Sequence, residues 1–180
     1  MFSRRFILGA IPAVLLSRHT RADATVYFST DTVKAQMFGL ANRFVDRSFD
    51  LTRAQSSAIR AASRARVNSN RITAFDAYRA NQKLGTLVID RVYGKHEFIT
   101  YAVAISAGGA VTGVEIMDYR ESYGDQVRNE RWRAQFTGRR AGQPLSINNE
   151  IRNISGATLS CVHITDGVRR VLATYSQLLA

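Results

Sequence analysis

Residues 98–119 read FITYAVAISAGGAVTGVEIMDY, and this stretch decides the fold expected for the chain. Both halves are rich in β-branched and aromatic residues, which favours strands. The turn signal Ala107-Gly108-Gly109 separates them, so the two halves are expected to pair as an antiparallel hairpin. After the turn the residues alternate, which predicts a second strand with one more apolar face. One face would carry Val111, Gly113, Glu115 and Met117, and the other Thr112, Val114 and Ile116.

Outside this hairpin the same strand-like composition recurs at residues 72–80 and 84–93, and more weakly at 44–51. Helices are expected on both sides of the sheet. The clearest begins at Thr52-Arg53-Ala54-Gln55, where the threonine and glutamine fit a capping box, and continues to about Ser63. The other expected helices cover about residues 33–40, 131–136 and 159–178. The sequence therefore predicts an α+β fold, a mainly antiparallel sheet flanked by helices.

The first 24 residues are typical of an export signal. Arg4-Arg5 precedes the apolar run 6–16, and Ala22-Asp23-Ala24 offers small residues for cleavage. The paired arginines approximate a twin-arginine signal, with the general secretion route as the alternative. The run is short for a bilayer span, so no integral membrane segment is expected after cleavage. We expect a periplasmic protein with a single domain, residues 25–180.

Composition excludes several function classes. The 180 residues carry a net charge of +11, but the arginines are scattered without dense runs, so most are expected to be solvated and no nucleic-acid partner is expected. Cys161 is the single cysteine, more typical of a small buried residue than of a redox group. No histidine, cysteine or carboxylate spacing indicates a metal site, and no nucleophile and base pair indicates catalytic residues.

The sequence Ser155-Gly156-Ala157-Thr158-Leu159-Ser160 precedes the last expected helix. Gly156 and Ala157 leave room for a bulky group near the backbone, and free amides at a helix start favour an anion such as phosphate. Thr158 would be well placed to carry a phosphate ester. On these residues alone, a loop and a helix cap is the simpler interpretation.

Three further blocks precede this sequence in order, and they are Gly113-Val114-Glu115, Tyr119 to Gly124 and Arg131 to Gly138. Together with Ser155 to Thr158 they resemble a known family. The chain from about 84 to 178 is similar to the FMN-binding domain of flavin-carrying subunits in sodium-pumping NADH:quinone reductases, Rnf-type complexes and small exported flavoproteins. The resemblance implies FMN joined to Thr158 by a phosphoester bond, which a separate flavin transferase makes from FAD.

The resemblance also implies a set of cofactor-binding residues. Ser155, Gly156, Ala157, Leu159 and Ser160 would flank the ester, although Ser160 also fits a plain helix start. A second segment, Glu121, Ser122, Tyr123 and Gly124, would lie against the flavin.

Several of these positions keep two interpretations. Glu121 fits either a hydrogen bond near the cofactor or a solvated loop carboxylate. Tyr123 stands where the family usually has proline, and its ring fits either stacking on the flavin or covering the loop. Trp132 fits a packing anchor better than a flavin contact. Arg152 occupies a place, six residues before Thr158, where family members often carry an acidic residue that bears on transferase recognition.

The expected function is a periplasmic electron-transfer flavoprotein, which passes electrons between a membrane-bound redox partner and another exported protein. A carrier is favoured over a self-contained enzyme because no substrate-processing constellation accompanies the motif. Two alternatives stay open. One is an FMN-dependent reductase of a small molecule, and the other is a binding module without redox chemistry.

Overall fold

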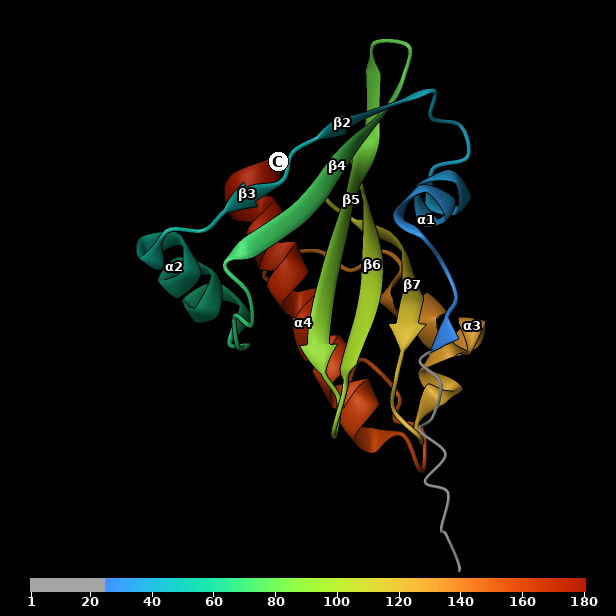
Figure 1. The fold of residues 1–180 in the computed structure, drawn as a ribbon. Coiled ribbons are helices and arrows are strands. Elements are labelled where there is room, and N and C mark those ends of the chain that lie inside the picture. Colours follow the sequence, from blue (N-terminus) through green and yellow to red (C-terminus); the bar gives the residue numbers. More distant parts are fainter. Residues whose placement is uncertain (1–24) are drawn as a thin grey trace, which may run out of the picture.

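The computed structural model describes residues 25–180, so the expected export signal lies outside the described residues. An antiparallel sheet with the strand order β1-β7-β6-β5-β4-β2 forms the centre of the fold (Figure 1), and the short strand β3 also pairs with β4. The predicted α+β class is confirmed. The strands are β1 (Thr25–Val26), β2 (Arg43–Asp46), β3 (Phe49–Asp50), β4 (Arg71–Arg79), β5 (Gln82–Tyr93), β6 (Phe98–Ser106) and β7 (Val111–Tyr119).

The helices begin where local capping signals place them. The capping box of α2 is confirmed, because Thr52 Oγ1 accepts from the Gln55 amide at 3.2 Å and Gln55 Oε1 accepts from the Thr52 amide at 2.9 Å. Ser29 caps α1 through the Thr32 amide, so this helix starts earlier than expected. The helices are α1 (Thr30–Met37), α2 (Arg53–Ser63), α3 (Glu130–Arg133) and α4 (Thr158–Thr174), with 3-10 turns at Asp125–Arg128 and Ala134–Phe136 and a π-helical turn at Tyr175–Leu179.

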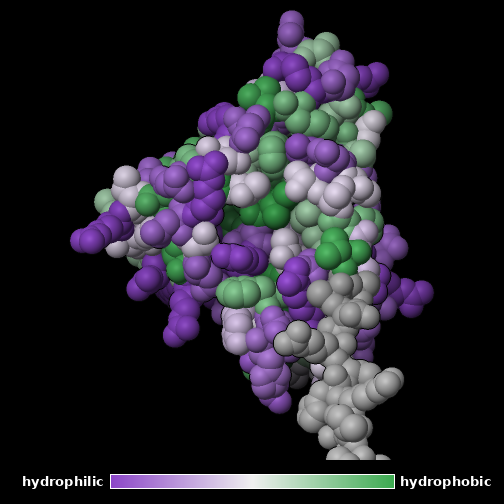
Figure 2. All heavy atoms as spheres, viewed as in Figure 1, coloured by the Kyte–Doolittle hydropathy of each residue, from purple (hydrophilic) through white to green (hydrophobic). Residues whose placement is uncertain are grey.

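Both faces of the sheet are covered, α4 lying on one face and α1 on the other (Figure 1). Strand β6 shows how the sequence achieves this. Its larger side chains, Ile99, Tyr101 and Val103 among them, pack with α4, whereas Ala102 and Ala104 pack with α1. The period of two along a strand assigns alternate residues to the two cores. In Figure 2, hydrophilic residues predominate at two separate places, over α2 at the left and at the tip of the β4–β5 hairpin at the top.

Strand β7 departs from the expected alternation at its first residue. The register shifts between Ala104 and Ile105, so that Val111 pairs with Ile105 and Gly113 with Ala104. A bulge of this kind moves the side chains before it to the other face of the sheet. The predicted placement of Val111 on the face of Glu115 and Met117 is therefore wrong, and Val111 joins the α4 core.

A buried polar network fixes α4 against the sheet. Asp90 Oδ2 accepts from the Tyr101 hydroxyl at 2.7 Å and from Arg170 Nη2 at 2.5 Å. Burial raises the pKa of Tyr101 well above its usual range, and the neighbouring Asp90 carboxylate raises it further. A Cβ on Gly167 would clash with the Tyr101 oxygen, so the glycine lets this side chain pass the helix. The network therefore sets the position of the helix that begins at Thr158.

Candidate functional site

A cavity of about 470 Å³ lies where three loops meet, at the N-terminus of α4, after β7, and at the turn between β5 and β6. Most of the residues implied by the family resemblance line it, and Gly124 and Ser155 are the two that do not. The role of all ten implied residues in cofactor binding stays a prediction. The lining residues are Lys95, His96, Glu121, Ser122, Tyr123, Gly156, Ala157, Thr158, Leu159 and Ser160.

The start of α4 is built to leave backbone amides free. The Ala157 amide donates to the Ile154 carbonyl at 3.0 Å, which closes a turn, and Gly156 has φ +83° within it. A Cβ on Gly156 would meet no atom within 4 Å. The amides of the first helical turn have no intrahelical acceptors, and none of the side chains in residues 25–180 caps them. Free amides and the helix dipole make this end of the cavity suited to a phosphate group.

Thr158 is the first residue of α4, and its side chain is exposed. Its Oγ1 accepts a hydrogen bond from Asn153 Nδ2 at 3.0 Å. Within residues 25–180, no carboxylate or imidazole hydrogen-bonds to this oxygen, so the described part of the chain offers it no general base. Sequence reasoning missed Asn153, which lies in the loop just before the motif and carried no signal of its own.

Glu121 ties the loop after β7 to the β5–β6 turn. Its Oε1 accepts from the amides of His96 at 2.5 Å and Glu97 at 3.0 Å. Partial burial acts to raise the pKa of this carboxyl, but the amides of Glu97, His96 and Lys95 together hold the pKa below its usual value. A Cβ on Gly94 would clash with the same oxygen, so the glycine makes this approach possible. Glu121 is thus a bridge between two walls of the cavity as well as part of its lining.

Tyr119, at the end of β7, joins the same loop to α4. Its hydroxyl donates to the Tyr123 carbonyl at 2.5 Å and lies 3.0 Å from Ser160 Oγ. Burial raises the pKa of Tyr119, and the hydrogen bond with Ser160 only partly offsets this. Gly124 has φ +94°, and a Cβ there would lie 2.6 Å from the Tyr119 oxygen. Gly124 therefore supports the site from behind, although it does not line the cavity.

The rim of the cavity carries exposed apolar and basic side chains. Tyr123 is 85% exposed and Leu159 48% exposed, so both offer apolar surface next to Thr158. Lys95 and His96, which sequence reasoning missed, bring basic groups to the opposite wall. The signal that could have found them is Gly94, a turn residue where the β5 strand pattern ends.

Two residues with open interpretations are buried in the α4 core and absent from the cavity wall. Trp132 is buried and stacks edge to face on Phe136 with ring centroids 5.2 Å apart, and its Nε1 donates to the Arg152 carbonyl at 2.8 Å. It is a packing anchor that also holds the segment leading to Thr158. Cys161 is fully buried, and burial raises the pKa of its thiol, which agrees with a packing role.

Two features, a group of metal ligands and a membrane-spanning helix, are absent from the described residues. In the described segment, no group of three histidine, cysteine or acidic side chains is arranged to hold a metal ion. From Thr25 onward, no helix combines the length and the apolar character that a membrane crossing needs.

Comparison with known families bears directly on this cavity. Residues 94–173 match the FMN-binding domain family. This similarity to an FMN-binding domain covers a little under half of the chain. Every residue that lines the cavity lies inside the matched segment. Strands β1 to β5 and helices α1 and α2 lie before it.

Two individual proteins are similar to this chain. One is a subunit of the Na⁺-translocating ferredoxin:NAD⁺ oxidoreductase complex of Acetobacterium woodii, which is 32% identical over 83 residues, or 41% of this chain. The chain spans 40% of the length of that relative. The other is Shewanella oneidensis NqrC, whose crystal structure superimposes with a TM-score of 0.45 and 14% sequence identity, covering 83% of this chain and 71% of that one.

Proposed function

We propose that the protein is a periplasmic electron-transfer flavoprotein that carries FMN in the cavity at the start of α4, joined to Thr158 by a phosphoester bond. It passes electrons between a membrane-bound redox partner and another exported protein. The observation that carries the proposal is the placement of Thr158, an exposed hydroxyl on an uncapped helix N-terminus, inside a cavity within the matched FMN-binding domain.

The residues present fit FMN. The free amides of α4 and the open space beside Gly156 suit its phosphate, and the apolar surfaces of Tyr123 and Leu159 suit its ring system. A cavity of about 470 Å³ lies within the size range of small-molecule sites, roughly 300–1,000 Å³. FMN supplies the oxidation and reduction chemistry when bound. The ammonium group of Lys95 would stabilise negative charge in the cavity. It would therefore favour the reduced, anionic form of FMN and raise the reduction potential of the cofactor.

The surroundings of Thr158 support attachment by a separate flavin transferase. Asn153 donates to Oγ1, and none of the described residues is placed to remove the hydroxyl proton. A transferase acting on FAD would supply the base. The Thr158 oxygen would then bond to the phosphorus of the FMN half, the pyrophosphate bond would break, AMP would leave, and the hydroxyl proton would pass to that base. The exposure of Thr158 gives such an enzyme access.

The similarity to a subunit of the Acetobacterium woodii oxidoreductase complex supports a membrane-bound partner. The cavity rim is open, with Tyr123 largely exposed, so a partner could approach a bound flavin without a large rearrangement. The export signal expected at residues 1–24 supports the periplasmic location and residues 25–180 as the mature domain.

The test is expression of the full chain with a flavin transferase, followed by denaturing electrophoresis and intact mass measurement. We expect flavin fluorescence that survives denaturation in the wild type and in Ser122→Ala, which removes another exposed hydroxyl of the same cavity. We expect none in Thr158→Ala. Fluorescent flavin retained by Thr158→Ala on the gel contradicts the assigned attachment residue. A wild type of unmodified mass that binds no FMN contradicts the proposal as a whole.

A further inference from the structure

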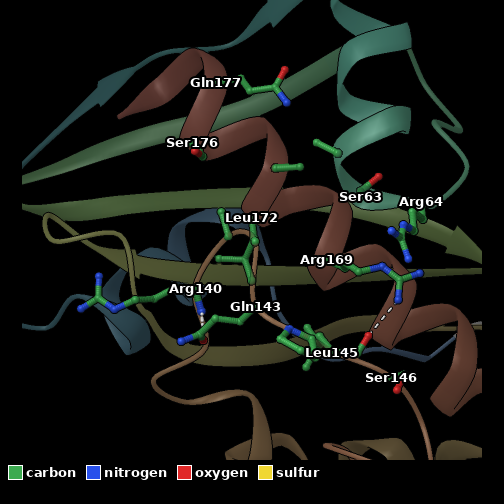
Figure 3. A pocket seen from close by; sticks show the side chains of 15 residues that line it. Ser63, Arg64, Arg140, Gln143, Leu145, Ser146, Arg169, Leu172, Ser176 and Gln177 are labelled. Carbon is green, nitrogen blue, oxygen red and sulfur yellow. Dashed lines mark hydrogen bonds between the residues drawn. The ribbon is translucent and has the colours of Figure 1, made fainter.

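A second, larger cavity lies away from the flavin site, at the other end of α4. Its volume is about 680 Å³, and it is bounded by the C-terminal end of α2, the loop 140–146 and the last turns of α4 (Figure 3). The rise along a helix places Arg169 roughly 16 Å from Thr158. The two cavities share no lining residue. We call this second space the arginine cavity, after Arg64, Arg140 and Arg169 in its wall.

The charged side chains that line the arginine cavity are all positive. Among the residues that the structure describes, three arginines line it, and no aspartate or glutamate does. Asp166 pairs with Arg169 Nη2 at 2.8 Å and offsets one charge. In the described residues, Arg64 and Arg140 have no ion pair with a carboxylate, so two positive charges stay uncompensated. Arg64 and Arg169 lie on one side of the view in Figure 3 and Arg140 on the other, with Gln143 between them.

Arg169 is held firmly in the wall. Its Nη1 donates to the Leu145 carbonyl at 2.8 Å and its Nη2 to Asp166. Each of these two nitrogens keeps a second N–H for which residues 25–180 offer no acceptor, so the guanidinium is incompletely satisfied. A fixed, partly unsatisfied guanidinium needs little reorganisation to accept an anion.

Arg64 reaches this wall from an unusual backbone position. It is the C-cap of α2 and has φ +53°, a left-handed conformation that ordinarily favours glycine or asparagine. A bulky residue in this conformation is uncommon, and such outliers gather at functional sites. Its side chain is exposed, so neither core packing nor a buried hydrogen bond accounts for an arginine here.

The floor of the cavity is apolar. Leu145, Leu172 and Ala173 are buried beneath the polar rim, which also carries Gln143 and Ser146. A simple inorganic anion would leave this floor unused. We propose that the arginine cavity is a second binding site, for an organic anion that bears a phosphate or carboxylate group on an apolar body. Arg64 and Arg169 would hold the anionic group and the floor the apolar part, whereas Arg140 Nη1 donates to the Gly108 carbonyl.

The experiment is isothermal titration calorimetry of the full-length protein with 1-naphthyl phosphate, a small aromatic phosphate ester. We expect saturable binding that weakens about tenfold in Arg64→Gln, the loss typical of one charge-assisted hydrogen bond. Arg64→Lys should recover part of the affinity because it restores the charge but not the planar fork. Arg64 is an exposed residue that makes no side-chain contact with the core, so these variants should fold normally.

Two control variants separate the site from other causes. Arg53→Gln removes an exposed charge from the same helix outside the cavity, and Arg79→Gln removes an exposed charge from the end of β4. Both should bind 1-naphthyl phosphate as the wild type does. Absence of binding by the wild type overturns the proposal, and so does an equal loss in either control. Arg64-dependent binding to phosphatidylglycerol vesicles, without binding of the naphthyl ester, also overturns it in favour of a lipid-surface contact.

Discussion

Glu121→Ala tests how the flavin cavity is held together. The carboxylate accepts two backbone amides, those of His96 and Glu97, and hydrogen bonds to charged groups contribute about 1.5–3 kcal/mol each. Water reaches this half-buried side chain, so the two bonds together should contribute about 2 kcal/mol to the local stability of the turn. Glu121→Gln keeps an acceptor oxygen and loses the charge, so it should cost about half as much.

The assay is amide hydrogen exchange by NMR at His96 and Glu97. A loss of about 2 kcal/mol corresponds to exchange roughly 30-fold faster in Glu121→Ala, provided that these amides exchange by local opening. Glu97→Gln is the matched control, because its exposed carboxylate lies in the same turn and makes none of the hydrogen bonds found for Glu121. The His96 amide should exchange in this control at the wild-type rate.

The same carboxylate should give the turn a pH dependence of known sign. The pKa of Glu121 in the folded protein lies below its ordinary value of 4.5. Its stabilising contribution is therefore fully present above that ordinary value and is lost as the pH falls through the folded pKa. Glu121→Gln should remove this component, so wild type and variant should converge in acid. Unchanged exchange at His96 and Glu97 in Glu121→Ala would refute the bridging role.

The remaining predictions concern two glycines of the site. Gly124→Ala should lower the free energy of unfolding by about 2–3 kcal/mol in urea denaturation, because it adds both strain at φ +94° and a contact 2.6 Å from the Tyr119 oxygen. Gly138→Ala, at φ +82° with open space around it, should show the strain alone, about 1 kcal/mol, and an equal loss in both variants would exclude the contact as a cause. Gly156→Ala should match Gly138→Ala in stability but take up less FMN, measured as flavin per protein, because its new methyl group enters the open space beside the helix amides.

Much of the fold could be predicted because its signals are local. The capping box at Thr52 and Gln55 and the four long strands depend on residues that are neighbours in the sequence. The position of Val111 could not, because the bulge beside it depends on how β6 and β7 are registered against each other. Residues 44–51 likewise divide into β2 and β3, which pair with different parts of β4.

The site was predictable where one continuous segment builds it. The motif around Thr158 and the loop from Glu121 both carry their residues in sequence order, and the fold brings the two segments to one cavity. Lys95 and His96 belong to a turn that reaches the same cavity only through tertiary contacts with Glu121. Gly94 marks the turn in the sequence, but nothing in the turn itself indicates that it reaches the cavity.

The polar groups around the cavity hold its position and leave Thr158 unactivated. Asp90 and Tyr101 lock α4 to the sheet, Tyr119 ties its first turn to the loop after β7, and Glu121 ties that loop to the β5–β6 turn. These hydrogen bonds join parts of the fold to one another, and none of them involves Thr158. Within the described part of the chain, Thr158 Oγ1 receives a single side-chain hydrogen bond, from an amide donor that cannot remove its proton. Thr158 thus has an unactivated hydroxyl in an open cavity whose walls are tied together. This arrangement suits a residue that another enzyme modifies and that then presents its cofactor to a partner.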